Sequence, residues 1–357
     1  MSQLFTPITL GALTLPNRIL MAPMTRNRAN QEGVPADITA TYYVQRANAG
    51  LIFTEATNVS EQAIGYPNTP GLYTDAQTAA WKKIVDAVHK AGGRIFAQLF
   101  HTGRLSHSSF QGGKTPVAPT AIAVEGNMYT YEGQKPYEMP RALELDEIPG
   151  LVEQFAHAAR NAKKAGFDGI EIHGANGYII DQFLKDGSNK RTDAYGGSAE
   201  NRARLLVEIT ESIVADWGGD RVGVRFSPAS GFNGMSDSNP LATFSVAIQA
   251  INHLKLAYIH VIDPLKGHMM HNPETDDIST HLKPLSKSPY IINGGYDAQT
   301  GAAAIETGRA DAVSYGVPFL ANPDLPKRFE TGAKLNAPDI DTFYQGGEKG
   351  YTDYPTL

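Results

Sequence analysis

Residues 169–178 read Gly-Ile-Glu-Ile-His-Gly-Ala-Asn-Gly-Tyr, and this stretch gives the clearest pointer to the fold. Its first four residues form a short apolar run that suits a buried strand, and polar side chains separated by glycines follow at once. Amphipathic stretches at 148–165 before it and 199–217 after it predict helices on both sides. A strand that lies between two helices in sequence is typical of a parallel βα arrangement.

The same alternation of strands and helices runs through the chain. Strands are predicted at 18–22, 51–56, 94–99, 169–172, 222–227, 258–262, 290–293 and 312–315. Helices are predicted at 38–47, 78–91, 148–165, 199–217, 242–254 and 299–307, with Asp75 as the N-cap of the second and Gly92-Gly93 as its stop. About eight βα units favour an α/β fold of the closed (β/α)8 TIM-barrel type, because an open sheet would need two edges and a strand-order switch.

Two segments fall outside the βα repeat. Runs at 8–10 and 13–15 flank Gly11-Ala12 and predict an N-terminal β-hairpin that plugs the bottom of the barrel. The polar, Gly/Pro-rich stretch at about 102–140 follows the third strand and is too long for a simple connection, so we expect a capping excursion. No linker or charge block divides residues 1–357, which we therefore expect to form a single domain.

Composition excludes several classes of function. The 31 basic and 37 acidic side chains give a net charge of −6, so the chain has no electrostatic footprint for nucleic acid or anionic membrane. It has no cysteine, which excludes disulfides, thiolate nucleophiles and zinc-cysteine sites. A signal-peptide pattern and an apolar run of ~18 residues are both missing. We expect a cytoplasmic protein with small-molecule partners, and the sequence leaves its oligomeric state open.

Reactive residues of such a barrel should lie at the C-terminal ends of its strands. This rule selects Thr25, Gln98, His173, Asn176, Arg225, Gly294, Gly295 and Gly316. His173 and Asn176 can converge on one oxygen and polarise a carbonyl, and Tyr178 supplies a phenol that can give up a proton. The alternative is a core histidine satisfied by the backbone and a tyrosine that packs under a helix.

Arg225 with Gln98 and Thr25 forms a second constellation. A cation in a dry barrel is costly unless an anion or an electron-rich ring compensates it, although a salt bridge to a distant acid would serve equally. Gly294 and Gly295 precede a predicted helix, where many barrels bind phosphate through backbone N–H groups.

A metal site can be assembled on paper in one loop-like segment. Its candidate ligands are His268, His271, Glu274, Asp276 and Asp277. Such polar clusters are more often solvated surface, and spacing alone provides no ordered ligand shell. We expect no metal.

These motifs occur together in a known family. The chain resembles, essentially end to end, the old yellow enzyme family of FMN-dependent ene-reductases. The matching segments are 15–18, 21–26, 50–56, 98–104, 140–143, 173–178, 191–202, 321–325 and 350–355. Thr25, where another branch has cysteine, is typical of the branch of N-ethylmaleimide and 12-oxophytodienoate reductases.

The resemblance implies non-covalent FMN, with NADPH or NADH as hydride donor. Residues implied to line the flavin ring are Pro23, Met24, Thr25, Ala56, Gln98 and Arg225. Arg225 would face the N1/O2 edge, where negative charge accumulates on reduction, and Thr25 would hydrogen-bond O4. His173 and Asn176 would hold the substrate carbonyl while Tyr178 protonates Cα. The pocket would be shaped by Tyr66, Phe100, Asn233 and Tyr344, with Phe100 where tryptophan is usual.

One position departs from the family. An arginine that grips the FMN phosphate usually follows Gly316, and this chain has Val317. Backbone N–H groups of Gly294, Gly295 and Gly316 could bind the phosphate instead, or Lys266 or Arg309 could take the arginine's place.

The implied function is reduction of activated C=C bonds in α,β-unsaturated carbonyls, maleimides and similar electron-poor alkenes, by ping-pong hydride transfer; phenols are implied ligands. One alternative is a flavin reductase that acts on nitroesters, nitroaromatics or quinones. Another is a flavin-less barrel that binds phenols or carbonyl compounds through His173 and Asn176.

Overall fold

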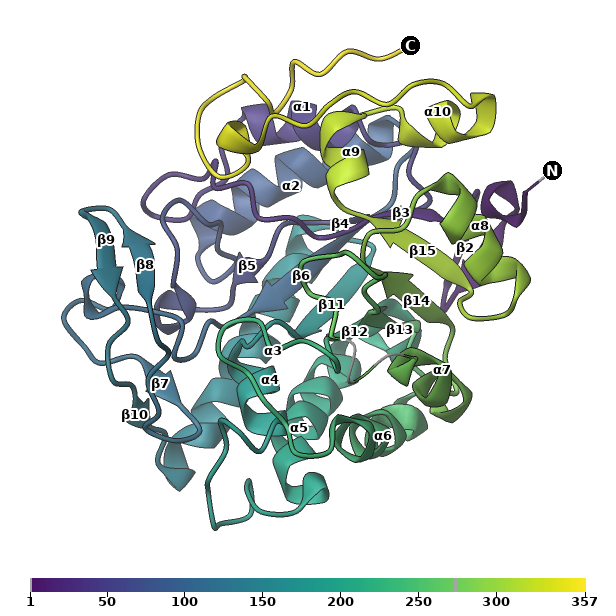
Figure 1. Ribbon diagram of the computed structural model, residues 1–357. Helices are drawn as coiled ribbons and strands as arrows, with labels where there is room; N and C mark the ends of the chain where they lie inside the picture. The colour runs from purple at the N-terminus through teal and green to yellow at the C-terminus, as the bar shows by residue number, and fades with distance from the viewer. Residues whose placement is uncertain (1, 273–274, 276) are drawn as a thin grey trace.

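The computed structural model describes residues 2–272, 275 and 277–357. Within them, eight parallel strands close into a barrel (Figure 1). In barrel order they are β3 (Ile19–Met21), β4 (Ile52–Phe53), β6 (Ile95–Phe100), β11 (Gly169–Gly174), β12 (Val222–Phe226), β13 (Tyr258–Ile262), β14 (Tyr290–Asn293) and β15 (Ala312–Tyr315). The barrel is closed because β15 pairs with β3 and β11 pairs with both β6 and β12. The predicted TIM-barrel fold is confirmed.

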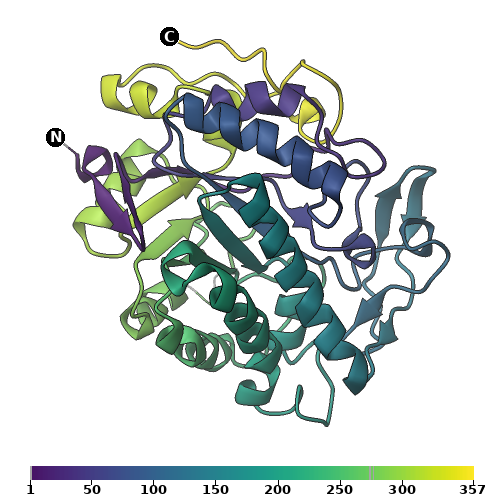
Figure 2. The ribbon, with the colours of Figure 1, turned by 180° about the vertical axis from the view of Figure 1, so that it is seen from behind.

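Helices cover the outside of the barrel (Figure 2). They are α1 (Ile38–Val44), α2 (Asp75–Lys90), α3 (Ile148–Ala165), α4 (Ile179–Leu184), α5 (Ala199–Trp217), α6 (Pro240–Ile251), α7 (Ile278–Leu282), α8 (Ala298–Glu306), α9 (Val317–Ala321) and α10 (Leu325–Thr331). The predicted ranges of α3 and α5 are correct to the residue, because both helices have long amphipathic patterns.

The predicted start of α2 is wrong. The helix begins at Asp75, three residues before the predicted first residue, and its N-cap is Thr74. The Thr74 side chain accepts the Gln77 backbone N–H at 3.2 Å, and the Gln77 side chain accepts the Thr74 N–H at 3.1 Å. This reciprocal capping box satisfies two N–H groups that a lone Asp75 cap would leave unpaired.

The N-terminal hairpin of β1 (Ile8–Leu10) and β2 (Leu13–Leu15) closes the end of the barrel where the strands begin. Leu10 and Leu15 are fully buried in a cluster with inward-facing residues such as Phe53 and Tyr258. At the tip, the Ala12 N–H donates to the Asp220 carbonyl at 2.9 Å. The predicted plug therefore fills the bottom, which leaves the opposite, C-terminal end of the strands for a site.

Several short strands lie outside the closed barrel. β5 (Thr57–Asn58) follows the break after β4 and pairs with the end of β6. In the excursion after β6, β7 (Val117–Ala118) pairs with β10 (Arg141–Ala142), and β8 (Asn127–Thr130) pairs with β9 (Gly133–Pro136). The β8–β9 hairpin stands at the left edge of Figure 1, away from the barrel strands.

The C-terminal segment runs back over α1. The Tyr351 ring stacks on the Tyr42 ring of α1 with centroids 4.1 Å apart. Arg26 and Arg28, which follow β3, donate to backbone carbonyls between residues 342 and 350. No helix among the described residues is both long and apolar enough to cross a membrane.

Candidate active site

The end of β11 carries three of the predicted site residues. His173 lies beside Arg225 in the parallel register of β11 and β12. The chain then turns through Asn176 (φ 60°) and Gly177 (φ 78°), and Tyr178 is the N-cap residue of α4. Two consecutive left-handed residues turn the chain sharply, so the side chains of this short segment gather at the C-terminal end of the barrel.

Tyr178 lies in an aromatic cluster built from three elements of the chain. Its ring lies edge-on to the rings of His173 and of Phe100, the last residue of β6. The distances between ring centroids are 4.9 Å and 5.2 Å respectively. Its hydroxyl donates a hydrogen bond to the Tyr66 hydroxyl at 3.3 Å. Four residues predicted to hold or protonate a substrate are thus brought together.

Burial controls the charge state of this cluster. It raises the pKa of Tyr178 to about 12, against the opposing effects of the Tyr66 hydrogen bond and the Arg225 charge. Burial, with the nearby Arg225 charge, also lowers the pKa of His173 well below its usual range. At neutral pH Tyr178 is therefore a protonated phenol and His173 a neutral imidazole, so each carries one donatable proton.

Two polar atoms of the cluster are buried without a hydrogen-bond partner among the described residues: His173 Nδ1 and Asn176 Oδ1. The backbone of Asn176 is engaged on both sides, because its N–H donates to Ser227 Oγ at 2.8 Å and its carbonyl accepts from Asn233 Nδ2 at 2.8 Å. Since an unpaired buried polar group costs about 1–3 kcal/mol, unsatisfied atoms on adjacent functional side chains are typical of a ligand site.

Arg225 is the buried cation of the site. Its Nη2 donates to Asn293 Oδ1 at 2.9 Å, and its Nε has no partner in the described parts of the chain. Burial lowers its pKa, but an arginine stays charged. No carboxylate of the described residues lies within ion-pair distance of the guanidinium, which contradicts the salt-bridge alternative.

Gln98 belongs to a buried polar chain across the barrel. Its Nε2 donates to Glu171 Oε1 at 2.8 Å, and Glu171 Oε2 is 2.8 Å from His260 Nδ1. His260 Nε2 is in turn 2.8 Å from Ser314 Oγ. The sequence analysis did not predict this chain of hydrogen bonds, although a glutamate between two isoleucines in a buried strand is a signal for a paired acid.

Glycines line the loops after β14 and β15. A Cβ on Gly294 (φ 138°) would lie 2.6 Å from the Pro264 backbone, so only glycine fits there. Gly316 precedes α9 and lies against Met24, whose Sδ would be 3.6 Å from a Cβ at that position. Val317, the next residue, is 46% exposed.

The two cations considered as substitutes at Val317 differ in their surroundings. Arg309 is held by Asp263, with Nε–Oδ2 at 2.8 Å and Nη2–Oδ1 at 3.1 Å, and also contacts Asp277. Lys266 is exposed and lies with Arg309 around a cavity of about 190 Å³. Arg309 would have to leave a two-bond carboxylate pair to reach an anion, whereas Lys266 would not.

The remaining predicted site residues lie around this centre. Thr25, Met24 and Pro23 follow β3 and are half-buried, and Ala56 is buried after β4. Tyr344 is 63% exposed, and it adds a small electrostatic effect to the burial that raises the pKa of Tyr178 and Tyr66. Tyr137, which the sequence did not single out, acts on the same two tyrosines from the excursion.

The candidate metal ligands from the sequence analysis do not form a metal site among the residues that the structure describes. Glu274 and Asp276 lie outside the described residues. Among the rest, no group of three His, Asp or Glu side chains could hold a metal ion. The predicted absence of a metal stays a prediction.

Comparisons with known proteins identify the family of this chain. The model of the NADH:flavin oxidoreductase / NADH oxidase family matches residues 3–336. The chain belongs to this family. 12-Oxophytodienoate reductase 1 of Oryza sativa subsp. japonica is 46% identical to this chain. The match covers 99% of this chain and 93% of the rice protein.

Solved structures of relatives extend the match to three dimensions. An old yellow enzyme homologue from Zymomonas mobilis is 47% identical with a TM-score of 0.97, over 99% of this chain and all of that one. Morphinone reductase in complex with tetrahydroNAD is 47% identical with a TM-score of 0.94, over 100% of this chain and 98% of that one. The chain is accordingly an NAD(P)H-dependent oxidoreductase whose cofactor is FMN.

The residues present fit FMN. The buried Arg225 guanidinium keeps an unpaired Nε, which needs an electron-rich partner. Met24 presents its thioether beside Gly316, where a Cβ would lie in ordinary van der Waals contact with Sδ at 3.6 Å. A flavin supplies both a negatively polarised ring edge and an apolar face, so it would satisfy the cation and cover the thioether.

Proposed function

We propose that this protein is an ene-reductase that reduces the activated C=C bond of small α,β-unsaturated carbonyl compounds, maleimides and similar alkenes. The observation that carries the proposal is the pairing of two unsatisfied, neutral polar side chains with a protonated phenol. His173 Nδ1 and the Nδ2 amide group of Asn176, whose Oδ1 is unpaired, are proposed to donate to one carbonyl oxygen, and Tyr178 lies against His173 with its proton retained.

The chemistry divides between cofactor and protein. Bound FMN supplies the hydride, which it receives from NADPH or NADH in a ping-pong sequence. The flavin ring would be held by Gln98, Arg225, Thr25, Ala56, Pro23 and Met24. The FMN phosphate would be held by Gly294, Gly295 and Gly316. Arg225 would stabilise negative charge at the ring edge, because a fixed cation in a dry site acts with little screening.

His173 and Asn176 act on the substrate by polarising its carbonyl. Two donors on one oxygen draw electron density from the conjugated alkene and make its Cβ electrophilic. Both donors are neutral, so they stabilise the oxygen most as it gains charge. Tyr66, Phe100, Asn233 and Tyr344 would surround the rest of the substrate.

Tyr178 completes the reaction by giving its proton to Cα. A pKa of about 12 keeps the phenol protonated at every physiological pH. The Tyr66 hydroxyl, which accepts the Tyr178 hydrogen bond before the transfer, can donate one to the Tyr178 phenolate afterwards, while the lost proton is replaced from solvent.

Anaerobic half-reactions test the proposal. The enzyme is reduced with NADPH and mixed in separate experiments with cyclohexenone, N-ethylmaleimide and a nitroaromatic, and flavin reoxidation is followed near ~450 nm, a band of the cofactor itself. We expect rapid reoxidation and saturated product with the two alkenes. Reoxidation by the nitroaromatic alone would instead identify a nitroreductase, and a purified protein without the flavin band would leave only a binding role.

A further inference from the structure

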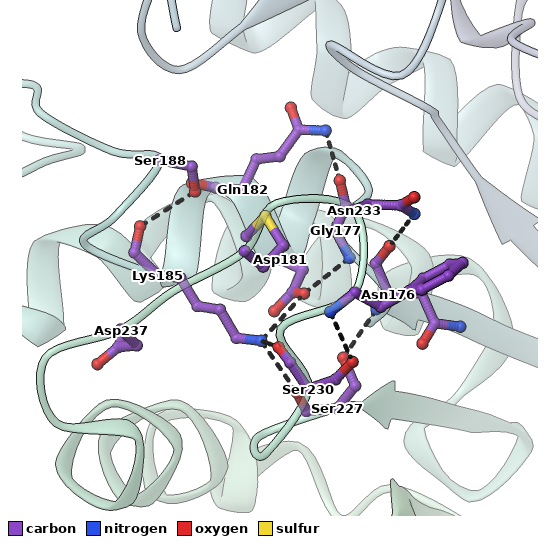
Figure 3. A network of polar contacts seen from close by, with 12 residues as sticks. Asn176, Gly177, Asp181, Gln182, Lys185, Ser188, Ser227, Ser230, Asn233 and Asp237 are labelled. Atoms are coloured by element: carbon purple, nitrogen blue, oxygen red, sulfur yellow. Dashed lines mark hydrogen bonds and ion pairs between the residues drawn. The ribbon is translucent and has the colours of Figure 1, made fainter. Parts of the chain in front are cut away.

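Asp181 and Lys185 form an ion pair directly behind the proposed catalytic turn (Figure 3). Both residues are buried, with 0% and 1% of their surface exposed, and Lys185 Nζ is 3.5 Å from Asp181 Oδ2. A buried ion pair gains little net stability over well-packed apolar side chains, so its hydrogen bonds to the surroundings indicate what it does.

Asp181 holds the turn from one side. Its Oδ2 accepts the backbone N–H of Gly177 at 2.8 Å, and the neighbouring Gln182 donates from Nε2 to the Gly177 carbonyl at 2.7 Å. Asn176 is a non-glycine residue in the left-handed region (φ 60°), a conformation that persists where the surrounding structure holds it. The Asp181 carboxylate and the Gln182 amide supply that restraint, because they bind the N–H and the carbonyl of Gly177, the residue after Asn176.

Lys185 holds the loop that flanks the turn on the other side. Its Nζ donates to the carbonyls of Ser227 at 3.0 Å and Ser230 at 2.9 Å. Ser227 Oγ accepts the Asn176 N–H, and Asn233, further along this loop, donates to the Asn176 carbonyl. In Figure 3 the ammonium group lies between the carboxylate and this loop.

We propose that the Asp181–Lys185 pair positions the Asn176 amide and the Tyr178 hydroxyl for catalysis. Asp181 bonds the Gly177 N–H directly, and Lys185 acts through the loop whose Ser227 accepts the Asn176 N–H. Asn176 and Tyr178 flank the glycine that Asp181 holds. What those two side chains do rests on the proposed function, but the restraint itself is a property of the folded chain.

Two double variants separate the charges from the hydrogen bond. Asp181→Asn/Lys185→Met removes both charges together and keeps an amide oxygen that can accept the Gly177 N–H. Asp181→Leu/Lys185→Met removes this acceptor as well. Removing both charges avoids an uncompensated buried charge, which alone could unfold the protein.

A matched control changes a similar pair elsewhere. Asp324 and Arg328 are also four residues apart, largely buried and joined at 2.7 Å, but they lie at α10. Asp324→Leu/Arg328→Met should lower thermal stability without any effect on the site.

Binding of 4-cyanophenol to the FMN-loaded enzyme is the first readout, followed through the flavin absorbance. We expect Asp181→Leu/Lys185→Met to weaken 4-cyanophenol binding about tenfold, which corresponds to the loss of one hydrogen bond. Asp181→Asn/Lys185→Met should recover most of the parent's affinity. In an Asn176→Ala background the Leu/Met change should add less than about twofold, because coupled residues are not additive. Parent-like binding by the Leu/Met variant, or a full tenfold effect in the Asn176→Ala background, would overturn the proposal.

Backbone hydrogen exchange of residues 174–179 is the second readout and needs no ligand. We expect faster exchange in the Leu/Met variant and parent-like exchange in the α10 control. Unchanged exchange at 174–179 contradicts the positioning role. If exchange changes as expected while even the parent binds no phenol and reduces no alkene, the proposed function fails and the restraint stands.

Discussion

His173 and Asn176 present unsatisfied polar groups beside a protonated phenol, and this pairing determines what single substitutions should do. Both side chains are proposed to donate to one oxygen, so a phenolate, which resembles a polarised carbonyl, should bind both. Neither residue carries a charge at neutral pH, because burial holds the pKa of His173 low. Ligand binding and proton delivery can therefore be separated by mutation.

We expect His173→Ala or Asn176→Ala to weaken binding of para-substituted phenols. The loss of one of two charge-assisted donors should cost on the order of 1.5–3 kcal/mol, or about one to two orders of magnitude in Kd. Flavin content should barely change. Phenol titrations of FMN-loaded protein measure the effect, and parent-like affinities in both variants would show that the oxygen site is elsewhere.

Tyr178→Phe should slow alkene reduction about 10²–10⁴-fold, the usual contribution of a general acid, while flavin reduction by NADPH stays nearly intact. The first half-reaction needs no proton from this phenol, whereas completing the saturated product does. Anaerobic stopped-flow measurement of the two half-reactions separates them. Equal losses in both would indicate a packing role in the aromatic cluster, and an unchanged oxidative half-reaction would assign the proton to another donor.

At the scale of elements, the loops after β14 and β15 and the short helix α9 form the proposed phosphate site. Val317, at the first position of α9, offers neither charge nor hydrogen bond. Arg309 is already held by Asp263 and Asp277. Phosphate binding should therefore rest on main-chain N–H groups, with the exposed Lys266 as the alternative cation.

Val317→Arg should tighten FMN binding by about one to two orders of magnitude, because one charge-assisted hydrogen bond contributes roughly 1.5–3 kcal/mol. The variant should also depend more on ionic strength than the parent. Fluorescence titration of apoprotein with FMN at two salt concentrations measures both effects. Lys266→Met is the companion variant: if Lys266 already serves the phosphate, this change weakens FMN and Val317→Arg gives no gain.

The sequence predicts elements better than it predicts their connections. Strands at 258–262, 290–293 and 312–315 are correct to the residue, because buried parallel strands are short, mostly apolar runs rich in β-branched and aromatic residues. The Gly177–Asp181 bond and the Glu171–His260 contact could not be predicted, since they depend on turn geometry and on strands distant in sequence. Arg225 was predicted from its place on a strand, but its Asn293 partner was not.

At the scale of the molecule, the first and last thirds of the chain are joined around Glu55. Glu55 Oε2 accepts the backbone N–H groups of Arg26 and Asn27, and the Arg26 guanidinium donates to the carbonyls of Phe343 and Gly350. The C-terminal segment that carries Tyr344 is held by these arginines. The protonation of Glu55 should therefore affect the stability of the contacts that join the two ends of the chain.

The stability of the protein should fall as the pH rises through the titration of Glu55. Burial raises its pKa from 4.5 to about 7, so between these values the folded protein binds more protons here than the unfolded chain. Glu55 therefore contributes stability that is fully present below about pH 4.5 and lost as the pH rises past 7. Glu55→Gln keeps an oxygen for both N–H groups but cannot titrate.

Urea unfolding from pH 4.5 to 8 measures the effect as the parent-minus-variant difference in unfolding free energy. Each pKa unit is worth about 1.4 kcal/mol. Between pH 4.5 and pH 8 the parent should therefore lose about 2–3 kcal/mol of unfolding free energy relative to Glu55→Gln. Glu330→Gln, at an exposed carboxylate of α10, is the control and should follow the parent at every pH. A difference for Glu55→Gln that is independent of pH would mean that Glu55 titrates alike in the folded and the unfolded protein, because Arg26 and the two N–H groups offset its burial.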